Sequence, residues 1–215
     1  DSLTYDITAW SLPYAHGLNA VASVSKVSST LNNSYKNRTN SIDKYSYAYL
    51  SKWNSLDDAT FLADLLKHNI VPRFTGKSFS SNGKSFEKGT IIILRNDNRN
   101  TNFDALLIEI ANKHKRELTA VSSGFSQSGV DFGSNSVKPI NKQKIAVISG
   151  EATSSLSFGE VWHFFETQLQ YPITNINSGN IGYTDLSKYD VIILPSGYYN
   201  SVFNKNTLDK IKKWT

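Results

Sequence analysis

The sequence predicts a mixed α/β fold built from two units, and three observations lead to this prediction. Continuously apolar runs such as Thr90–Arg95 and Lys144–Gly150 are typical of strands buried on both faces. Between such runs, apolar residues recur at the spacing of an amphipathic helix. A polar, glycine-bearing stretch, 123–143, separates the two groups of elements. We therefore expect four regions: an N-terminal packing segment and linker at 1–44, a first α/β unit at 45–122, a connector at 123–143 and a second α/β unit at 144–215.

The N-terminal region combines an aromatic segment with a polar one. Residues 23–44 are rich in Ser, Asn and Lys, which predicts a loop or linker. The first residues have the composition of a structured segment, and Ile211–Thr215 has that of an unfinished helix, so we expect a fragment cut from a longer protein. Residues 1–22, which precede this polar stretch, suit a segment packed against a neighbouring domain, because they carry large apolar side chains: Tyr5, Ile7, Trp10, Leu12, Tyr14 and Leu18.

Strands and helices alternate in the first unit. Thr101 and Asp104 have the spacing of a capping pair and predict the start of the second helix, while Asp57 and Asp58 start the first. Residues 77–89 suit a connection with a hairpin. The order β-α-β-β-α-β is that of the ferredoxin-like fold. The expected strands are Lys44–Trp53 (with Tyr45, Tyr47 and Tyr49 on one face and Ala48 and Leu50 on the other), Ile70–Phe74, Thr90–Arg95 and Leu118–Ser122.

The second unit reads as a strand, a helix and a strand. Its strands are Lys144–Gly150 and Asp190–Pro195, which predicts parallel pairing through a right-handed crossover. This is part of a doubly wound, flavodoxin-like domain. A unit of about 70 residues buries a marginal core and leaves strand edges open. We therefore expect it to pack against the first unit or to self-associate. The apolar stripe of its helix is Phe158, Val161, Trp162, Phe165 and Leu169.

The carboxyl ends of these parallel strands are the place where a ligand is expected. Ligands of open α/β sheets bind beyond the strand ends, and a helix N-terminus there favours polar or anionic groups. The hydroxyl-rich loop Glu151–Ser157 follows the first strand, and Ser196–Tyr199 follows the second. The candidate ligand-binding residues are Glu151, Ser154, Ser155 and Ser196.

Composition excludes several classes of chemistry. The chain has 215 residues and a formal net charge of +5. Its basic residues are scattered, so a solvated basic surface is favoured over a nucleic-acid partner. The chain has no cysteine, which excludes disulfides and thiol catalysis. No apolar run approaches the roughly 20 residues of a membrane-spanning helix.

Two segments resemble a known family. Asp1–Ala15 and Phe86–Ile93 are similar to segments that follow the catalytic domain in large bacterial zinc carboxypeptidase-like proteins. The unit from Lys144 resembles the start of a class I glutamine amidotransferase-like domain. The resemblance implies a peptidase domain upstream in the same chain as partner, zinc in that domain rather than here, and a periplasmic or extracellular location.

The catalytic residues of these families have no counterpart in the sequence. The peptidases use a His-x-x-Glu pair after a strand, but His114–Glu117 and His163–Glu166 fall within or at the end of predicted helices. We expect His114 to be a half-buried, hydrogen-bonded residue and His163 to make a surface contact with Glu166. His16 and His68 lack partners at ligand spacing, so neither a catalytic residue nor a metal ligand is assigned. Amidotransferases need a cysteine, which is absent.

Three functions remain as hypotheses. The first is a non-catalytic accessory region that supports the peptidase domain or a partner interaction. The second is a small-molecule or sugar-binding module that uses the loop Glu151–Ser157. The third is RNA binding, because the β-α-β-β-α-β order and surface tyrosines also describe an RNA-recognition sheet. Lys88–Ile92 disfavours this reading because it offers no aromatic residue to stack a base.

Overall fold

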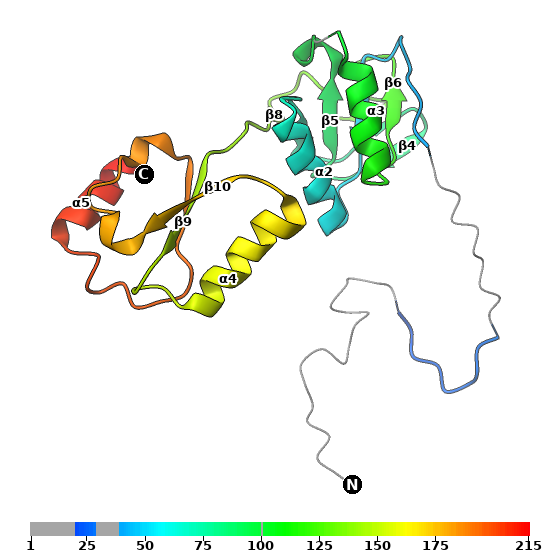
Figure 1. Ribbon diagram of the computed structural model, residues 1–215. Helices are drawn as coiled ribbons and strands as arrows, with labels where there is room; N and C mark the ends of the chain where they lie inside the picture. The colour runs from blue at the N-terminus through cyan, green and yellow to red at the C-terminus, as the bar shows by residue number, and fades with distance from the viewer. Residues whose placement is uncertain (1–19, 29–38, 100) are drawn as a thin grey trace. The chain divides into compact units, whose positions relative to one another are not determined.

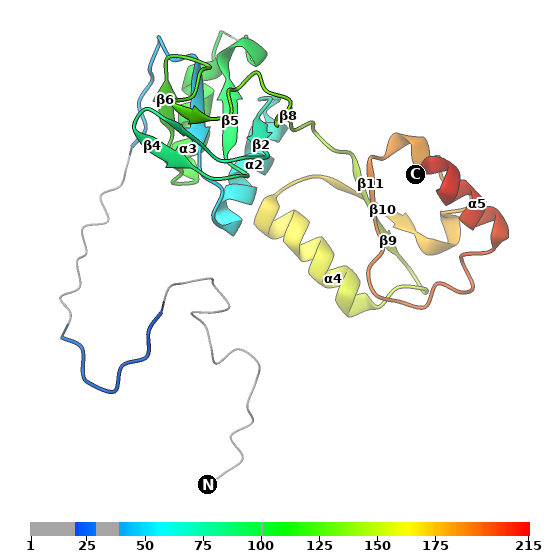
Figure 2. The same ribbon diagram turned by 180° about the vertical axis from the view of Figure 1, so that it is seen from behind.

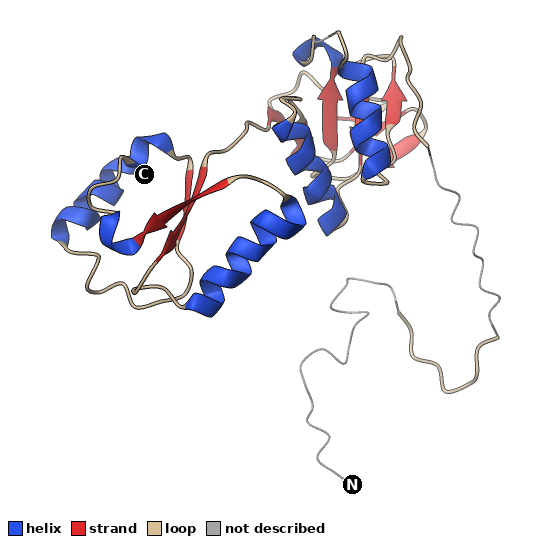
Figure 3. Ribbon diagram, viewed as in Figure 1, coloured by secondary structure: helices blue, strands red, loops and turns tan. Residues whose placement is uncertain are grey.

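A computed structural model describes residues 20–28, 39–99 and 101–215 (Figure 1). The chain divides into Asp1–Lys36 and Asn37–Thr215, and the helices and strands described here all belong to the second part. Most of the expected N-terminal packing segment lies outside the described residues. Four α-helices, antiparallel sheets and a small parallel sheet make up the described elements, which confirms the mixed α/β class (Figure 3).

The first unit is built on a five-stranded antiparallel sheet with the strand order β6-β1-β5-β2-β8. A second antiparallel sheet has the order β4-β3-β7 and contains the hairpin expected within 77–89. The elements are β1 (Ala48–Ser51), α2 (Leu56–Lys67), β2 (Arg73–Thr75), β3 (Phe79–Ser81), β4 (Lys84–Phe86), β5 (Ile91–Leu94), a 3-10 turn (Arg95–Asp97), α3 (Phe103–Lys113), β6 (Thr119–Val121), β7 (Ser128–Gly129) and β8 (Val137–Pro139).

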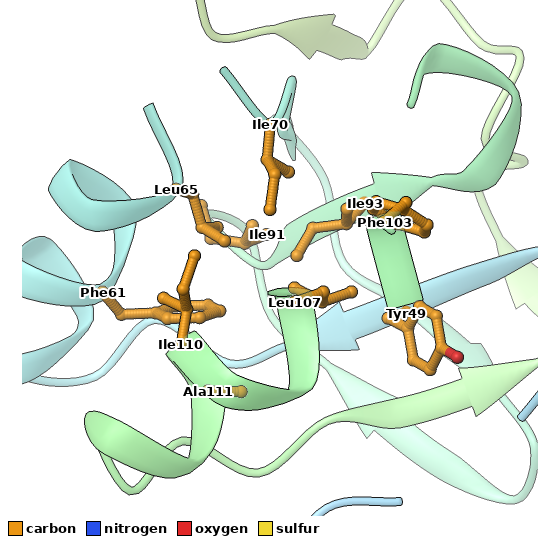
Figure 4. Close-up of a cluster of buried hydrophobic side chains, with 10 residues drawn as sticks. All are labelled: Tyr49, Phe61, Leu65, Ile70, Ile91, Ile93, Phe103, Leu107, Ile110 and Ala111. Carbon is orange, nitrogen blue, oxygen red and sulfur yellow. The ribbon is translucent and has the colours of Figure 1, made fainter. Parts of the chain in front are cut away.

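Both faces of the five-stranded sheet are covered. Helices α2 and α3 pack on one face, where Ile91 and Ile93 meet Phe61 and Leu107 (Figure 4). On the other face, Ile92 and Leu94 belong to a cluster that includes side chains of β3 and β4. Ile91–Leu94 is therefore buried on both sides, as its continuous apolar run predicts.

Two local predictions for this unit are wrong in detail. The tyrosine-rich strand is shorter than expected, because β1 contains only Tyr49, which is buried, while Tyr45 and Tyr47 precede it. The start of α3 is not capped by Thr101. Its N-cap is Asn102, and the carboxylate of Asp104 instead binds the guanidinium of Arg95.

The second unit is a three-stranded parallel sheet with the order β10-β9-β11. The two expected strands are present as β9 and β11. Strand β10 lies between them in the sequence but forms one edge of the sheet, beside β9. Figures 1 and 2 show α4 and α5 on opposite sides of this sheet. The elements are β9 (Ile145–Ser149), α4 (Ser155–His163), a π-helical continuation (Phe164–Leu169), β10 (Ile173–Asn177), two 3-10 turns (Ser178–Asn180 and Leu186–Lys188), β11 (Val191–Ile193) and α5 (Lys205–Trp214).

The two units have separate sheets but share a small apolar cluster. Residues 123–143, the expected connector, supply β7 and β8 to the sheets of the first unit. Ala63 and Leu66 of α2 are buried together with Tyr171, which follows the π-helical turn. The hydroxyl of Tyr171 donates a hydrogen bond to the carbonyl oxygen of Gln143 at 2.8 Å. Packing of the second unit against the first, one of the two expected outcomes, is therefore present.

Candidate functional site

The loops after β9 and β11 lie side by side, as the sequence predicts for the carboxyl ends of neighbouring parallel strands. The backbone N–H of Ser154 donates to the carbonyl oxygen of Ser196 at 2.8 Å. Thr153 and Gly197 form an antiparallel bridge, and the N–H of Tyr198 donates to Ala152 at 2.8 Å. The backbones of the two loops are therefore paired with each other along the place where a ligand was expected.

The four predicted site residues differ in what they contact. The Ser154 hydroxyl caps α4 by accepting from the N–H of Ser157 at 3.4 Å, and Ser196 donates its N–H to the hydroxyl of Ser157 at 2.9 Å. Glu151 and Ser155 are exposed. The structure thus brings Ser154 and Ser196 together through their backbones and uses the hydroxyl of Ser154 as a helix cap.

Glycine makes this loop pairing possible. A Cβ at Gly197 would overlap the carbonyl oxygen of Ala152 and would lie 2.9 Å from the Cα of Thr153. Gly150 has a φ of 96°, a left-handed conformation that side-chain-bearing residues rarely adopt. Both glycines are thus required by the close approach and the sharp turn of the backbone, independently of any ligand.

The histidines that share the His-x-x-Glu spacing have other partners. The ring of His114 is half-buried, and its Nε2 lies 2.8 Å from Asp64 Oδ2, as expected for a hydrogen-bonded structural histidine. The expected contact of His163 with Glu166 is wrong, because Glu166 accepts a hydrogen bond from the indole of Trp162 at 2.6 Å. The described part of the chain contains no group of three or more His, Cys, Asp or Glu side chains that could hold a metal ion.

The surroundings of His114 resemble a relay but do not activate a nucleophile. The Thr60 hydroxyl lies 3.3 Å from His114 Nδ1, on the side of the ring opposite Asp64. However, this hydroxyl donates its proton to the carbonyl oxygen of Asp57 at 2.8 Å. A nucleophile needs its proton directed at the base. The array therefore serves to join α2 and α3.

Asp64 is the centre of this join. Its side chain is buried, with Lys113 Nζ 2.8 Å from Oδ2 and Lys67 Nζ 3.1 Å from Oδ1. Burial alone raises the pKa of a carboxyl group, but the hydrogen bonds from Lys113 and His114 and the nearby charge of Lys67 outweigh it and hold the pKa of Asp64 well below its ordinary value. Asp64 is thus a charged group with a structural role, and the ammonium groups of Lys67 and Lys113 lie beside it.

A second candidate site, which the sequence did not predict, lies at one end of the five-stranded sheet. It is an open hollow of about 610 Å³ between the turn before β1 and the segment after β5. The sequence pattern does not reveal it, because the alternation of tyrosines predicts a strand that includes Tyr45 and Tyr47. The aspartate at the start of the turn, Asp43, was the available signal. The lining residues are Lys44, Tyr45, Ser46, Tyr47, Arg95, Asn96, Asn98, Arg99, Phe103 and Ser122.

Arg95 lines this hollow and connects the turn before β1 to α3. Its guanidinium donates to both carboxylate oxygens of Asp104, at 2.6 and 2.8 Å, and to the backbone oxygen of Ser46 at 2.8 Å. It also lies over the ring of Phe103. Burial raises the pKa of Asp104, but the hydrogen bonds from Arg95 and from the hydroxyl of Tyr49 lower it overall. The charge of Arg95 is therefore matched within the fold.

Comparisons with known proteins found no relative of this chain. Protein-family models, curated proteins and solved structures were all searched, and none matches this chain. Among the described residues, the helices are too short or too polar to cross a membrane. The fold and the two candidate sites thus define a mixed α/β protein.

Proposed function

We propose that this chain is a non-catalytic accessory region of a bacterial metallocarboxypeptidase-like protein, which supports the peptidase domain or a partner interaction. In this proposal the first unit is ferredoxin-like, supported by the antiparallel order β6-β1-β5-β2 with two helices on one face. The second is part of a flavodoxin-like or amidotransferase-like unit, supported by the parallel order β10-β9-β11. The zinc belongs to the upstream domain, and the location is periplasmic or extracellular.

One observation carries the non-catalytic reading: the polar side chains best placed for chemistry are engaged in holding the fold. Ser157 accepts a hydrogen bond from the backbone of Ser196, and His114 is bonded to Asp64. Freeing either group for catalysis would break a contact between two elements. A scaffold with its polar groups committed in this way suits a supporting or partner-binding role better than turnover.

The RNA-recognition hypothesis is not favoured by the packing of the sheet. That module stacks bases on the open face of its sheet, opposite the helices. Here this face carries Leu50 and Ile92, and both are buried in a cluster with Phe79 and Phe86 of the smaller sheet. Bases would have to displace that layer to reach the strands.

The experiment compares the peptidase domain with and without this region. The purified chain alone is incubated with C-terminally varied peptides, and the peptidase domain is assayed alone, covalently linked to the chain, and mixed with it. We expect no hydrolysis by the chain alone and a higher thermal midpoint for the linked peptidase. Hydrolysis by the chain that is lost in Ser154→Ala or His114→Ala, while the variant remains folded, would refute the non-catalytic role. An identical thermal midpoint and no binding in the mixture would refute the supporting role.

A further inference from the structure

The hollow at the end of the five-stranded sheet presents aromatic side chains from a rigid turn. The turn at Asp43–Ser46 is tied to the sheet by Arg95, which donates to the carbonyl oxygen of Asp43 at 3.0 Å and to the hydroxyl of Ser46 at 2.8 Å. The backbone N–H of Asp43 also donates to the hydroxyl of Tyr49, at 3.2 Å. A turn held from both sides keeps the side chains it presents in a fixed place, which lowers the entropic cost of binding.

Two tyrosine rings are exposed at this turn. Tyr45 is 92% exposed and Tyr47 is 42% exposed. Tyr47 lies directly against the backbone of Gly124, where an added Cβ would be only 2.9 Å from the ring carbon Cε1. The absence of a side chain at Gly124 therefore leaves room for this ring. Aromatic rings held open to solvent at a hollow offer the apolar faces on which a flat or ring-shaped ligand can pack.

The charges around the rings are few: the carboxylate of Asp43, which accepts from the backbone N–H of Tyr45 at 2.9 Å, and the cations of Lys44 and Arg99. Lys44 and Arg99 are exposed, and within the described residues neither makes an ion pair. Arg99 is oriented by the side-chain oxygen of Asn96, which accepts from its Nη2 at 2.6 Å. Arg95, by contrast, is already paired with Asp104. The hollow thus offers a small number of available cations beside two ring faces.

We propose that this hollow binds an acidic sugar residue of an oligosaccharide. The C–H face of the sugar packs on Tyr45 and Tyr47, and its carboxylate is bound by Lys44 and Arg99. The amide of Asn96 supplies hydrogen bonds to ring hydroxyls. The open shape of the hollow suits one residue of a longer chain. This proposal goes beyond the accessory role, because it gives the first unit a ligand of its own.

A single-stranded nucleic acid also stacks on aromatic rings, but the hollow favours the sugar. Nucleic-acid binding draws most of its affinity from several phosphate contacts along the backbone. The described part of the hollow offers only Lys44 and Arg99 for such contacts once Arg95 is paired. One carboxylate per sugar residue matches this charge better than a run of phosphates.

The test is an NMR titration of the full chain with trigalacturonate as the probe. Neutral galactotriose and a short oligouridylate are titrated in parallel. We expect the amide signals of Lys44–Tyr47 and Asn96–Arg99 to shift with trigalacturonate and not with galactotriose. Tyr45→Ala should weaken the affinity by about tenfold, since the ring supplies a main packing face. Lys44→Gln should weaken it as well.

Matched variants separate this site from general surface effects. Tyr183 is 91% exposed in the second unit, so Tyr183→Ala removes a comparable ring elsewhere, and Lys188→Gln removes an exposed charge there. Both should bind trigalacturonate as the unchanged chain does. Tyr45→Phe should retain most of the affinity because it keeps the ring. Absence of trigalacturonate binding, equal binding of galactotriose, tighter binding of the oligouridylate, or equal loss in Tyr183→Ala would each overturn the proposal.

Discussion

His114 Nε2 and Asp64 Oδ2 lie 2.8 Å apart and join the end of α3 to the last turn of α2. Asp64 is nearly fully buried, and its other oxygen, Oδ1, accepts no well-directed hydrogen bond from the described residues although Lys67 Nζ is 3.1 Å away. We take that contact as electrostatic. The two helices that cover one face of the main sheet are thus held at one charged group.

The first prediction concerns this group and pH. Because the folded state holds the pKa of Asp64 below its ordinary value of 3.8, the folded chain binds fewer protons than the unfolded chain. The stabilisation is therefore complete above the unfolded pKa and is lost as the pH falls toward the folded one. We expect Asp64→Asn to lower the free energy of unfolding at neutral pH by about 2 kcal/mol. Urea unfolding at a series of pH values measures this.

The variant should also show a shallower loss of stability between neutral pH and about pH 3. Some loss will remain, because the pKa of Asp104 is lowered as well. Asp185→Asn is the matched control, since that carboxylate is exposed and accepts from the hydroxyl of Ser187. We expect it to change stability much less than Asp64→Asn. Parallel pH curves for the unchanged chain and Asp64→Asn would show that Asp64 does not stabilise the fold by its charge.

The strands that could be predicted from the sequence are those whose own apolar pattern identifies them. Ile91–Leu94 is continuously apolar and is buried on both faces, so its pattern alone identifies the strand. The same holds for β9, where Ala146–Ile148 is fully buried. The stretch Ile173–Asn177 is not predicted as a strand by its own pattern, because the polar residues Thr174, Asn175 and Asn177 interrupt the apolar residues. Its place comes from pairing with β9.

Side-chain partners that are distant in sequence could not be predicted. Asp104 has the spacing of a helix cap, but it binds Arg95 and Tyr49, because the fold brings these basic and phenolic groups to it. Glu166 binds the indole of Trp162, one helical turn away, rather than His163. Spacing along the sequence predicts only which neighbours a residue has on the same helix. Only the three-dimensional packing decides which of them, or which distant group, it contacts.

The same distinction applies to the candidate sites. The loop pair after β9 and β11 followed from the rule that strand ends meet, and Ser154 and Ser196 do meet there. That rule does not say whether the two loops will pair with each other. The hollow at Tyr45 depends on the contact of Arg95 with residues 43–46, which are about 50 positions away in sequence.

The second prediction tests the contact between the two loops. The hydroxyl of Ser157 accepts from the N–H of Ser196 at 2.9 Å, so Ser157→Ala leaves that N–H without its partner. We expect the free energy of unfolding to fall by about 1 kcal/mol. Ser155→Ala, on an exposed hydroxyl of the same helix turn, should stay within about 0.5 kcal/mol of the unchanged chain. Equal effects of the two substitutions would contradict a role for the Ser157–Ser196 bond.

The third prediction uses two glycines with opposite surroundings. Gly197 has no room for a Cβ beside Ala152, so Gly197→Ala should separate the loops and cost about 2 kcal/mol of stability. Gly159 lies in α4, and outside the backbone of its own helix no atom lies within 4 Å of the Cβ position, so Gly159→Ala should stabilise the chain by about 0.5 to 1 kcal/mol. Thermal and chemical unfolding measure both. A Gly197→Ala chain as stable as the original would mean that the loops do not pair as closely as described.

The fourth prediction concerns the apolar cluster that Tyr171 shares with Ala63 and Leu66. Burial raises the pKa of Tyr171, and the hydrogen bond of its hydroxyl to Gln143 fixes the ring at the start of the second unit. Tyr171→Ala removes the ring from this cluster, so we expect a loss of about 3 kcal/mol and earlier opening of both units. Tyr171→Phe keeps the ring and should cost about 1 kcal/mol.

Hydrogen exchange followed by mass spectrometry separates these effects, because it reports on each element. If the cluster couples the units, Tyr171→Ala should speed exchange in peptides from α2 as well as in peptides from β9, although α2 carries no substitution. Tyr171→Phe should leave α2 close to its original rate, since the ring still contacts Leu66. Faster exchange confined to β9 and its neighbours in the Ala variant would show that the second unit unfolds on its own. The cluster would then be a surface contact that contributes nothing to the stability of α2.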